Sequence, residues 1–227
     1  GLAINVKGNE GVVLPVIASP EAKQSPLKCD YATASIPTHQ DLLINEVAWM
    51  GSEVSASDEW LELKNISDHD LVLKNWQLID EDAQIHITFS NQILERGAFV
   101  LLERTNDASV PSMKADLIYT GALSNENEGL RLFNSNCVLA DEVLANSNWP
   151  AGGTNPKRSL ERMGNLEWRT YSGSDNNGVF GTPKAENSVG ATSGQNVFNN
   201  NVVDSGFRRN DGLEAIASST PSNGIQH

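Results

Sequence analysis

Acidic side chains at matching positions of predicted strands are the residues best placed to do chemistry. Glu46 and Glu62 occupy equivalent places in two apolar segments, and Asp80 ends a third. Carboxylates that converge with backbone carbonyls suit calcium, which takes about six to eight oxygen ligands, and paired carboxylates also serve glycoside hydrolysis. The structural alternative is that these glutamates hydrogen-bond the backbone or pair with a cation such as Arg162. We favour this structural role because no calcium-loop spacing is present. Glu46, Glu62 and Asp80 remain the candidate ligands if a metal binds.

The histidines provide no catalytic constellation. His86 alternates with apolar neighbours and is predicted to face outward, whereas His39, His69 and His227 lie in polar segments where we expect them to be solvent-exposed. No metal-binding helix motif, nucleophile elbow or Walker loop occurs. We therefore predict no catalytic residues, no enzyme activity and no cofactor other than the calcium considered above.

Tryptophan is the other residue type that could form a binding site. In a sandwich, tryptophan is most often buried between the two sheets, whereas a sugar platform needs two or three exposed and coplanar rings. Trp60 lies opposite the face formed by Leu61 and Leu63, so it is the best candidate for an exposed aromatic. A calcium-dependent carbohydrate-binding module is therefore the alternative function that we carry forward.

The elements that must position these residues are short strands. Apolar runs with period-two alternation recur every eight to twelve positions and are separated by turn residues, the pattern of a sandwich or barrel. No window of about eleven residues shows a helical apolar period, so the fold class is all-β. The predicted strands span residues 42–49, 59–65, 71–73, 76–80, 84–89, 98–103, 117–120, 129–133 and 138–143.

Composition argues against two classes of partner. The net charge of -13 repels nucleic acid, which attracts proteins through positive patches, so no nucleic-acid partner is expected. No apolar run approaches the roughly 20 residues that a membrane-spanning helix needs, so no membrane insertion is expected either.

The chain divides into three parts by composition. Residues 1–39 are expected to be a linker or loosely attached arm, residues 40–188 the folded domain, and residues 189–227 a disordered tail rich in Gly, Ser and Asn. Cys29 falls in the arm and Cys137 in the domain. A single pair is far from the dense spacing of a disulfide scaffold, so we expect two free thiols rather than a bridge.

The order of certain residues along the chain carries a family resemblance. The motif begins with Ile-Asn-Glu in the first strand and Glu-Trp-Leu-Glu-Leu in the second, and it ends with Gly-Thr-Pro near residue 183. Its positions are Ile44, Asn45, Glu46, Glu59, Trp60, Glu62, Asn65, Trp76, Trp149, Arg162, Trp168, Gly181 and Pro183. This series resembles the lamin-tail domain family in its bacterial form, over about two thirds of the chain.

The resemblance implies an immunoglobulin-like β-sandwich used for recognition or scaffolding. Bacterial members of the family look like parts of exported or surface proteins, and no heptad pattern precedes Leu42 here, so the rod of a lamin is absent from this prediction. We therefore expect a non-catalytic interaction or adhesion module of an exported or surface-attached bacterial protein. It would be extracellular or at the cell surface and would bind a protein partner or a cell-surface component.

Overall fold

The structure, a computed structural model, describes residues 25, 27–32, 35–111 and 113–188, and within them it contains fourteen strands and no helix. No described element could therefore cross a membrane as a helix. The strands are β1 (Leu42–Ala48), β2 (Trp60–Asn65), β3 (Leu71–Val72), β4 (Gln77–Asp80), β5 (His86–Thr88), β6 (Ile93–Leu94), β7 (Phe99–Arg104), β8 (Leu117–Tyr119), β9 (Glu128–Phe133), β10 (Leu139–Ala145), β11 (Gly153–Thr154), β12 (Lys157–Arg158), β13 (Leu160–Arg162) and β14 (Trp168–Thr170).

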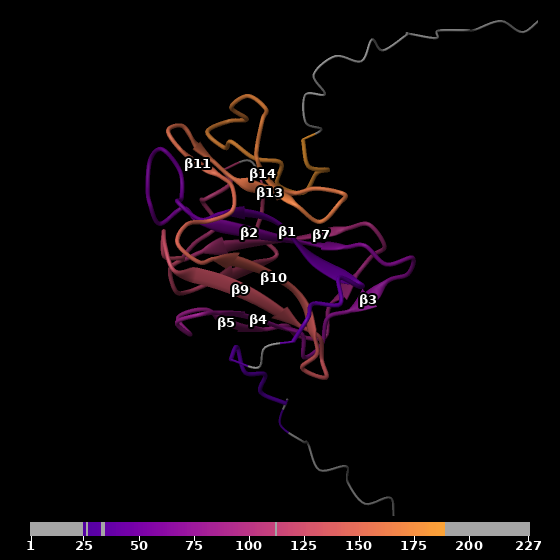
Figure 1. Cartoon of the computed structure of the whole chain (residues 1–227). Helices are drawn as coiled ribbons and strands as arrows, with labels where there is room; N and C mark the ends of the chain where they lie inside the picture. The colour runs from indigo at the N-terminus through magenta and orange to yellow at the C-terminus, as the bar shows by residue number, and fades with distance from the viewer. Residues whose placement is uncertain (1–24, 26, 33–34, 112, 189–227) are drawn as a thin grey trace, which may run out of the picture. The chain divides into compact units, whose positions relative to one another are not determined.

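Two sheets face each other as the layers of a sandwich (Figure 1). The first has six strands in the order β14-β13-β1-β2-β7-β8, and the second has four in the order β10-β9-β4-β5. Neighbouring strands are antiparallel except β7 and β8, which run parallel. Two small sheets, β3-β6 and β11-β12, complete the fold, which is an all-β, immunoglobulin-like sandwich as predicted.

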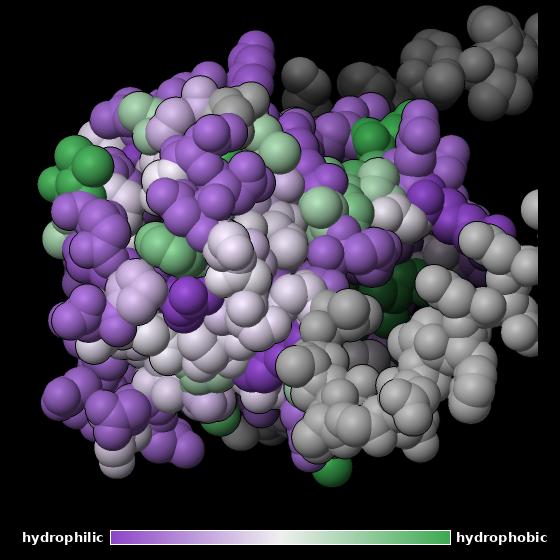
Figure 2. All heavy atoms as spheres, turned by 90° about the horizontal axis from the view of Figure 1, so that it is seen from above, coloured by the Kyte–Doolittle hydropathy of each residue, from purple (hydrophilic) through white to green (hydrophobic). Residues whose placement is uncertain are grey.

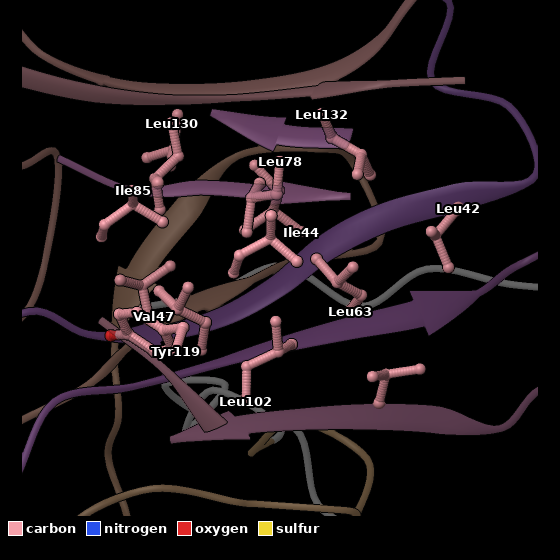
Figure 3. Packing of buried hydrophobic residues seen from close by; sticks show 14 of the residues in the cluster. Leu42, Ile44, Val47, Leu63, Leu78, Ile85, Leu102, Tyr119, Leu130 and Leu132 are labelled. Carbon is pink, nitrogen blue, oxygen red and sulfur yellow. The ribbon is translucent and has the colours of Figure 1, made fainter. Parts of the chain in front are cut away.

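The core lies between the two layers and is built by period-two alternation. Ile44 and Leu63 extend from the six-stranded sheet toward Leu78 and Leu130 of the four-stranded sheet (Figure 3). All four side chains have no exposed surface. Burial of apolar area on this scale is the main favourable term in forming the sandwich.

All nine predicted strands are present, with ends that shift by one or two residues. The prediction missed β6 and the four strands after residue 150. These strands are two or three residues long, and a segment such as Leu160–Arg162 has too few residues to show an alternation.

A disulfide joins Cys29 to Cys137 across 108 residues of sequence, so the expectation of two free thiols is wrong. Cys29 is only 4% exposed and packs with Phe133 and Leu139 on the four-stranded sheet. Its N–H donates to Gln77, whose amide donates in turn to the carbonyl of Leu27. A stretch that composition marks as a linker is therefore anchored on the sandwich. The tail predicted over residues 189–227 and the arm up to residue 24 lie outside the described residues.

Candidate functional site

Three glutamates form a row across the outer side of the six-stranded sheet. Glu46 of β1 is the register partner of Glu161 of β13 on one side and of Glu62 of β2 on the other. All three side chains have no exposed surface. We call Glu161, Glu46 and Glu62 the glutamate row.

A β-bulge at Asn45 directs Glu46 into this row. Ile44 pairs with Leu63, but the next pair is Glu46 with Glu62, so Asn45 is the extra residue. Without the bulge, Glu46 would share the core-facing side of Ile44, because side chains alternate along a strand. The sequence carries a signal for the bulge: apolar core positions fall at 42, 44 and then 47, and this break in the alternation was not used in the prediction.

The glutamate row holds residues 181–188, here named the C-terminal clasp, against the sheet. Each glutamate accepts a backbone N–H from the clasp, and these bonds run from Thr182 to Glu46 (2.9 Å), from Lys184 to Glu62 (2.5 Å) and from Ser188 to Glu161 (2.7 Å). Side-chain hydroxyls add to them, because Ser159 and Thr182 donate to Glu46. Glu46 and Glu62 therefore hydrogen-bond the backbone, as the structural alternative expected. Their donors include backbone amides of the clasp, and Arg162 is not among them.

Burial sets the protonation of the row. It raises the pKa of Glu46 to about 8, although Ser159 and Thr182 donate hydrogen bonds that lower it. It also raises the pKa of Glu62 to about 7 against the hydrogen bonds from Lys184 and Asn45. At neutral pH the row thus carries less than its full formal charge.

Several motif residues support the clasp. The amide of Asn187 donates to the carbonyls of Asn45 and Arg162, and the side chain of Asn45 donates to Glu62. Gly181 lies so close that an added Cβ would be 2.6 Å from the carboxylate of Glu46 and 2.6 Å from the ring of Trp60. Pro183 is buried.

Arg162 lies in a different buried pair. Its guanidinium contacts Asp141 at 2.5 Å, donates to the carbonyl of Ile44 and lies 3.9 Å from the ring centroid of Trp168. His39 also contacts Asp141, at 3.1 Å, so this histidine is half-buried rather than solvent-exposed as predicted.

The tryptophans are structural in their contacts. Trp60 does lie on the face opposite Leu61 and Leu63, but it is only 3% exposed because it packs with Leu101 and Val179, so the prediction of an exposed aromatic is wrong. Trp49 and Trp149 stack on each other at 6.0 Å between ring centroids and are both buried. Trp76 is buried in the main core, and Trp168 is half-buried.

Asn65, the last residue of β2, hydrogen-bonds the chain segments around it. Its amide donates to the carbonyls of His69, Leu94 and Glu95, and its carbonyl oxygen accepts from Ser67. This single side chain ties together two loops, which explains why an asparagine ends β2.

Asp80 is not brought to Glu46 and Glu62. It ends β4 in the four-stranded sheet, where its carboxylate accepts the N–H of Ile85 at 2.9 Å. The three predicted metal ligands therefore belong to two separate regions, the glutamate row and the β4-β5 hairpin. Burial raises the pKa of Asp80 to about 7.

A cleft of about 530 Å³ opens at the end of the sandwich where β1 and β7 end and β2 begins. Its walls include the apolar residues Trp49, Met50 and Leu123 and the charged residues Glu59, Arg104 and Lys157. The segment from 120 to 127, between β8 and β9, and the hairpin of β11 and β12, through Thr154 and Lys157, complete its rim. The prediction named Glu59 as a motif position but not Arg104, because charged residues at strand ends have no distinctive spacing.

Glu59 is the only carboxyl among the residues that line the cleft, and it is held on both oxygens. Arg104 donates to one at 2.8 Å, and the N–H of Leu123 donates to the other at 3.0 Å. Burial raises the pKa of Glu59 to about 7. The lining contains no histidine or cysteine, and its ionisable side chains are those of Glu59, Arg104 and Lys157.

Comparison with known protein families agrees with this architecture. Residues 36–147, which contain β1 to β10, match the family model of the lamin tail domain. No curated protein matches the chain. Together with the immunoglobulin-like sandwich, the match shows that this chain belongs, through residues 36–147, to the lamin tail domain family.

Proposed function

We propose that this domain is a non-catalytic interaction or adhesion module that contacts a protein partner or cell-surface component through the loops around the cleft. The observation that carries the proposal is the cleft itself, an amphipathic hollow formed by loops at one end of a rigid sandwich. Loops held by a rigid framework are the usual place for recognition in immunoglobulin-like folds. Trp49, Met50 and Leu123 offer apolar contact, while Arg104 and Lys157 offer charge.

The chemistry of the cleft supports recognition rather than catalysis. Glu59 is paired with Arg104, and Lys157 donates to the carbonyl of Ser52. Ser124 lines the cleft without a histidine in the lining, so the lining provides no serine-histidine pair for covalent catalysis. The buried carboxylates of the glutamate row lie outside the cleft and accept hydrogen bonds from the clasp.

The surface elsewhere favours a small recognition site over a broad apolar interface. On the face seen from above the six-stranded sheet, hydrophobic residues lie in small separate groups among hydrophilic ones (Figure 2). Stable obligate interfaces instead present large contiguous apolar areas. The net charge of -13 also supports a partner that is not nucleic acid.

The disulfide supports an exported or surface-attached location. Cysteine bridges persist in oxidising compartments and are rare where thiols are kept reduced. Cys29 and Cys137 close a loop of 108 residues and fix the N-terminal segment on the sandwich. We therefore propose an extracellular or cell-surface setting, in agreement with the resemblance to bacterial family members.

A calcium-dependent carbohydrate-binding module is the alternative function. Four of the five tryptophans are buried and Trp168 is half-buried beneath Arg162, so the described residues include no exposed tryptophan platform for a sugar. This geometry supports the protein-binding proposal more than the alternative.

Filling the cleft with large side chains tests the proposal. Ala56 and Asn125 are exposed residues of the cleft lining, and tryptophan at both positions reduces its volume without changing the core. The wild type, the double variant Ala56→Trp with Asn125→Trp and a control, Lys74→Trp, are applied to arrays of immobilised surface proteins and glycans. Lys74 is exposed in the loop before β4, at the opposite end of the sandwich.

We expect protein ligands that bind the wild type and Lys74→Trp but bind the double variant at least tenfold more weakly. Glycan ligands with no protein ligands would favour the carbohydrate alternative. Binding that the double variant retains and the control loses would place the recognition surface elsewhere and contradict the proposal.

A further inference from the structure

We propose that Asp80, Asp82 and Glu128 form a divalent cation site, with calcium as the preferred ion. The three residues supply carboxylate oxygens that all lie within 4.8 Å of one another. Two oxygens bound to the same calcium ion lie at most about 5 Å apart, so one ion can contact all three. In the described part of the chain this is the one such group of three.

The site is built by two elements of the four-stranded sheet. Asp80 ends β4, Asp82 follows in the turn that leads to β5, and Glu128 begins β9. Because Asp80 is the register partner of Leu130, strand pairing brings the start of β9 beside the end of β4. The carboxylates therefore meet through the sheet register, although 46 residues separate Asp82 from Glu128.

An unsatisfied buried oxygen points to a ligand, independently of the clustering. The side chain of Asp80 has no exposed surface, and its Oδ2 atom has no hydrogen-bond partner among the residues that the structure describes. Its Oδ1 atom accepts the N–H of Ile85. Native structures usually satisfy a buried polar atom with a hydrogen bond, an ordered water or an ion, so this oxygen is open to a ligand.

No cation of the protein compensates the cluster. Among the described residues, none of the ion pairs involves Asp80, Asp82 or Glu128. Three carboxylates therefore gather without a neutralising side chain. A bound divalent cation supplies the missing positive charge.

Glu128 is held in place for this role. Its Oε1 accepts the N–H groups of Glu81 and Gly129, and its Oε2 accepts the N–H of Ser124. A carboxylate offers about four lone-pair sites, so one remains on Oε2. Asp82 is exposed, which gives an ion access from solvent and leaves room for water to complete the coordination.

The donor set favours calcium over other ions. All three ligands are carboxylates, the hard oxygen donors that calcium takes at about 2.3 to 2.6 Å in flexible geometry. Zinc prefers nitrogen and sulfur donors, and neither histidine nor cysteine belongs to the group. Because water must supply the remaining ligands, we expect a Kd of about 10⁻⁴ to 10⁻³ M, the range of extracellular calcium modules.

A proton shared by Asp80 and Asp82 is the competing occupant. Burial raises the pKa of Asp80 to about 7, and the neighbouring carboxyl of Asp82 contributes to that rise. A proton would satisfy Asp80 Oδ2 without any metal. The two occupants are distinguished by their response to calcium at a pH above 7.

The test is a calcium titration of the full chain, freed of metal with a chelator, at about pH 7.5. Calorimetry is expected to show one site, and the midpoint of thermal unfolding is expected to rise by about 2 to 9 °C at about 5 mM calcium. Magnesium is expected to bind more weakly, because it requires near-ideal octahedral geometry.

Two variants assign the site. Asp82→Asn removes an exposed ligand and is expected to weaken calcium binding at least tenfold, whereas Glu126→Gln removes the same charge from an exposed residue nearby and is expected to leave binding unchanged. Glu128→Gln provides a second ligand variant if Asp82→Asn does not fold. Calcium binding that is absent in the wild type, or equal in the wild type and the ligand variants, would overturn the proposal. This readout needs no partner, so it is independent of the proposed function.

Discussion

Two groups of three carboxylates differ in how their buried oxygens are satisfied. In the glutamate row, every carboxylate accepts a backbone N–H from the C-terminal clasp. In the cluster of Asp80, Asp82 and Glu128, one buried oxygen of Asp80 has no hydrogen-bond partner in the described part of the chain. The row lies between a sheet and a chain segment, whereas the cluster opens to solvent through Asp82.

The difference shows that burial and acidity alone do not identify a ligand site. Both regions contain carboxyls whose pKa is raised by burial, to about 8 for Glu46 and to about 7 for Asp80. Only the count of hydrogen-bond donors separates them. A carboxylate with donors on each oxygen stabilises the fold, and one with a free buried oxygen is available to bind a cation.

The largest expected effect comes from depriving a satisfied carboxylate of its partner. Arg162→Met removes the guanidinium from fully buried Asp141 and should lower the free energy of unfolding by about 3 to 5 kcal/mol, because an unpaired charge is left in the interior. Denaturant unfolding measures this loss. Arg96→Met, at an exposed position, should change stability by less than about 0.5 kcal/mol. Equal effects of the two substitutions would show that the buried pair is not important for stability.

A smaller loss should follow when the glutamate row loses an acceptor. Glu46→Leu leaves the N–H of Thr182 without its partner and should cost about 1 to 3 kcal/mol. Glu46→Gln keeps an acceptor and should cost less than about 1 kcal/mol, since burial already favours the uncharged form of this side chain. Unfolding curves of the two variants at neutral pH test the prediction. A larger loss in Glu46→Gln than in Glu46→Leu would contradict the role assigned to the row.

Stability should also depend on pH in a direction set by the raised pKa values. Because Glu46 has a pKa of about 8 in the folded state, against an ordinary value of 4.5, the folded chain holds a proton that the unfolded chain releases between these pH values. The free energy of unfolding should therefore fall as pH rises from about 5 to about 8. Glu62, with a pKa of about 7, contributes in the same direction.

Denaturant unfolding at several pH values measures this dependence. Glu46→Gln has no titrating carboxyl at this position, so its stability should fall less steeply than that of the wild type over the same interval. A stability that rises with pH would show that the hydrogen bonds from Ser159 and Thr182 outweigh burial in setting the ionisation of Glu46.

The smallest effect on stability is expected from a substitution in the cluster of Asp80, Asp82 and Glu128 when no metal is bound. Asp82→Asn reduces repulsion among carboxylates at an exposed position, so stability in the presence of a chelator should change by no more than about 0.5 kcal/mol. Thermal unfolding of Asp82→Asn beside Glu126→Gln provides the measurement. A large loss in Asp82→Asn alone would indicate a structural role for Asp82 and remove the contrast with the glutamate row.

The sequence predicted the fold more completely than the site. The alternation in segments such as Glu59–Asn65 revealed the main strands, because a half-buried strand must alternate. Strand β5 was found because it lies within the longer alternating run 84–89, whereas no such run surrounds β13 and β14. The disulfide was missed because nothing in the composition of the segment around Cys29 showed that it packs on the four-stranded sheet.

The candidate sites show where sequence reasoning stops. Glu46 and Glu62, predicted at equivalent places in two strands, are register partners, but Glu161 was not seen as the third member of the row, because its strand was not predicted. Asp80 was grouped with the wrong carboxylates, since strand order, and not sequence spacing, decides which residues meet. Glu128 carried no local signal and joins Asp80 only through the pairing of β4 with β9.

The most direct test of the contrast between the two regions is calcium binding measured by calorimetry on three forms of the full chain: wild type, Asp82→Asn and Glu62→Gln. The account predicts one calcium site in the wild type, the same affinity in Glu62→Gln, and at least tenfold weaker binding in Asp82→Asn. Loss of calcium binding in Glu62→Gln with full binding in Asp82→Asn would contradict it, because the glutamate row would then be the cation site and the cluster at Asp80 a structural one.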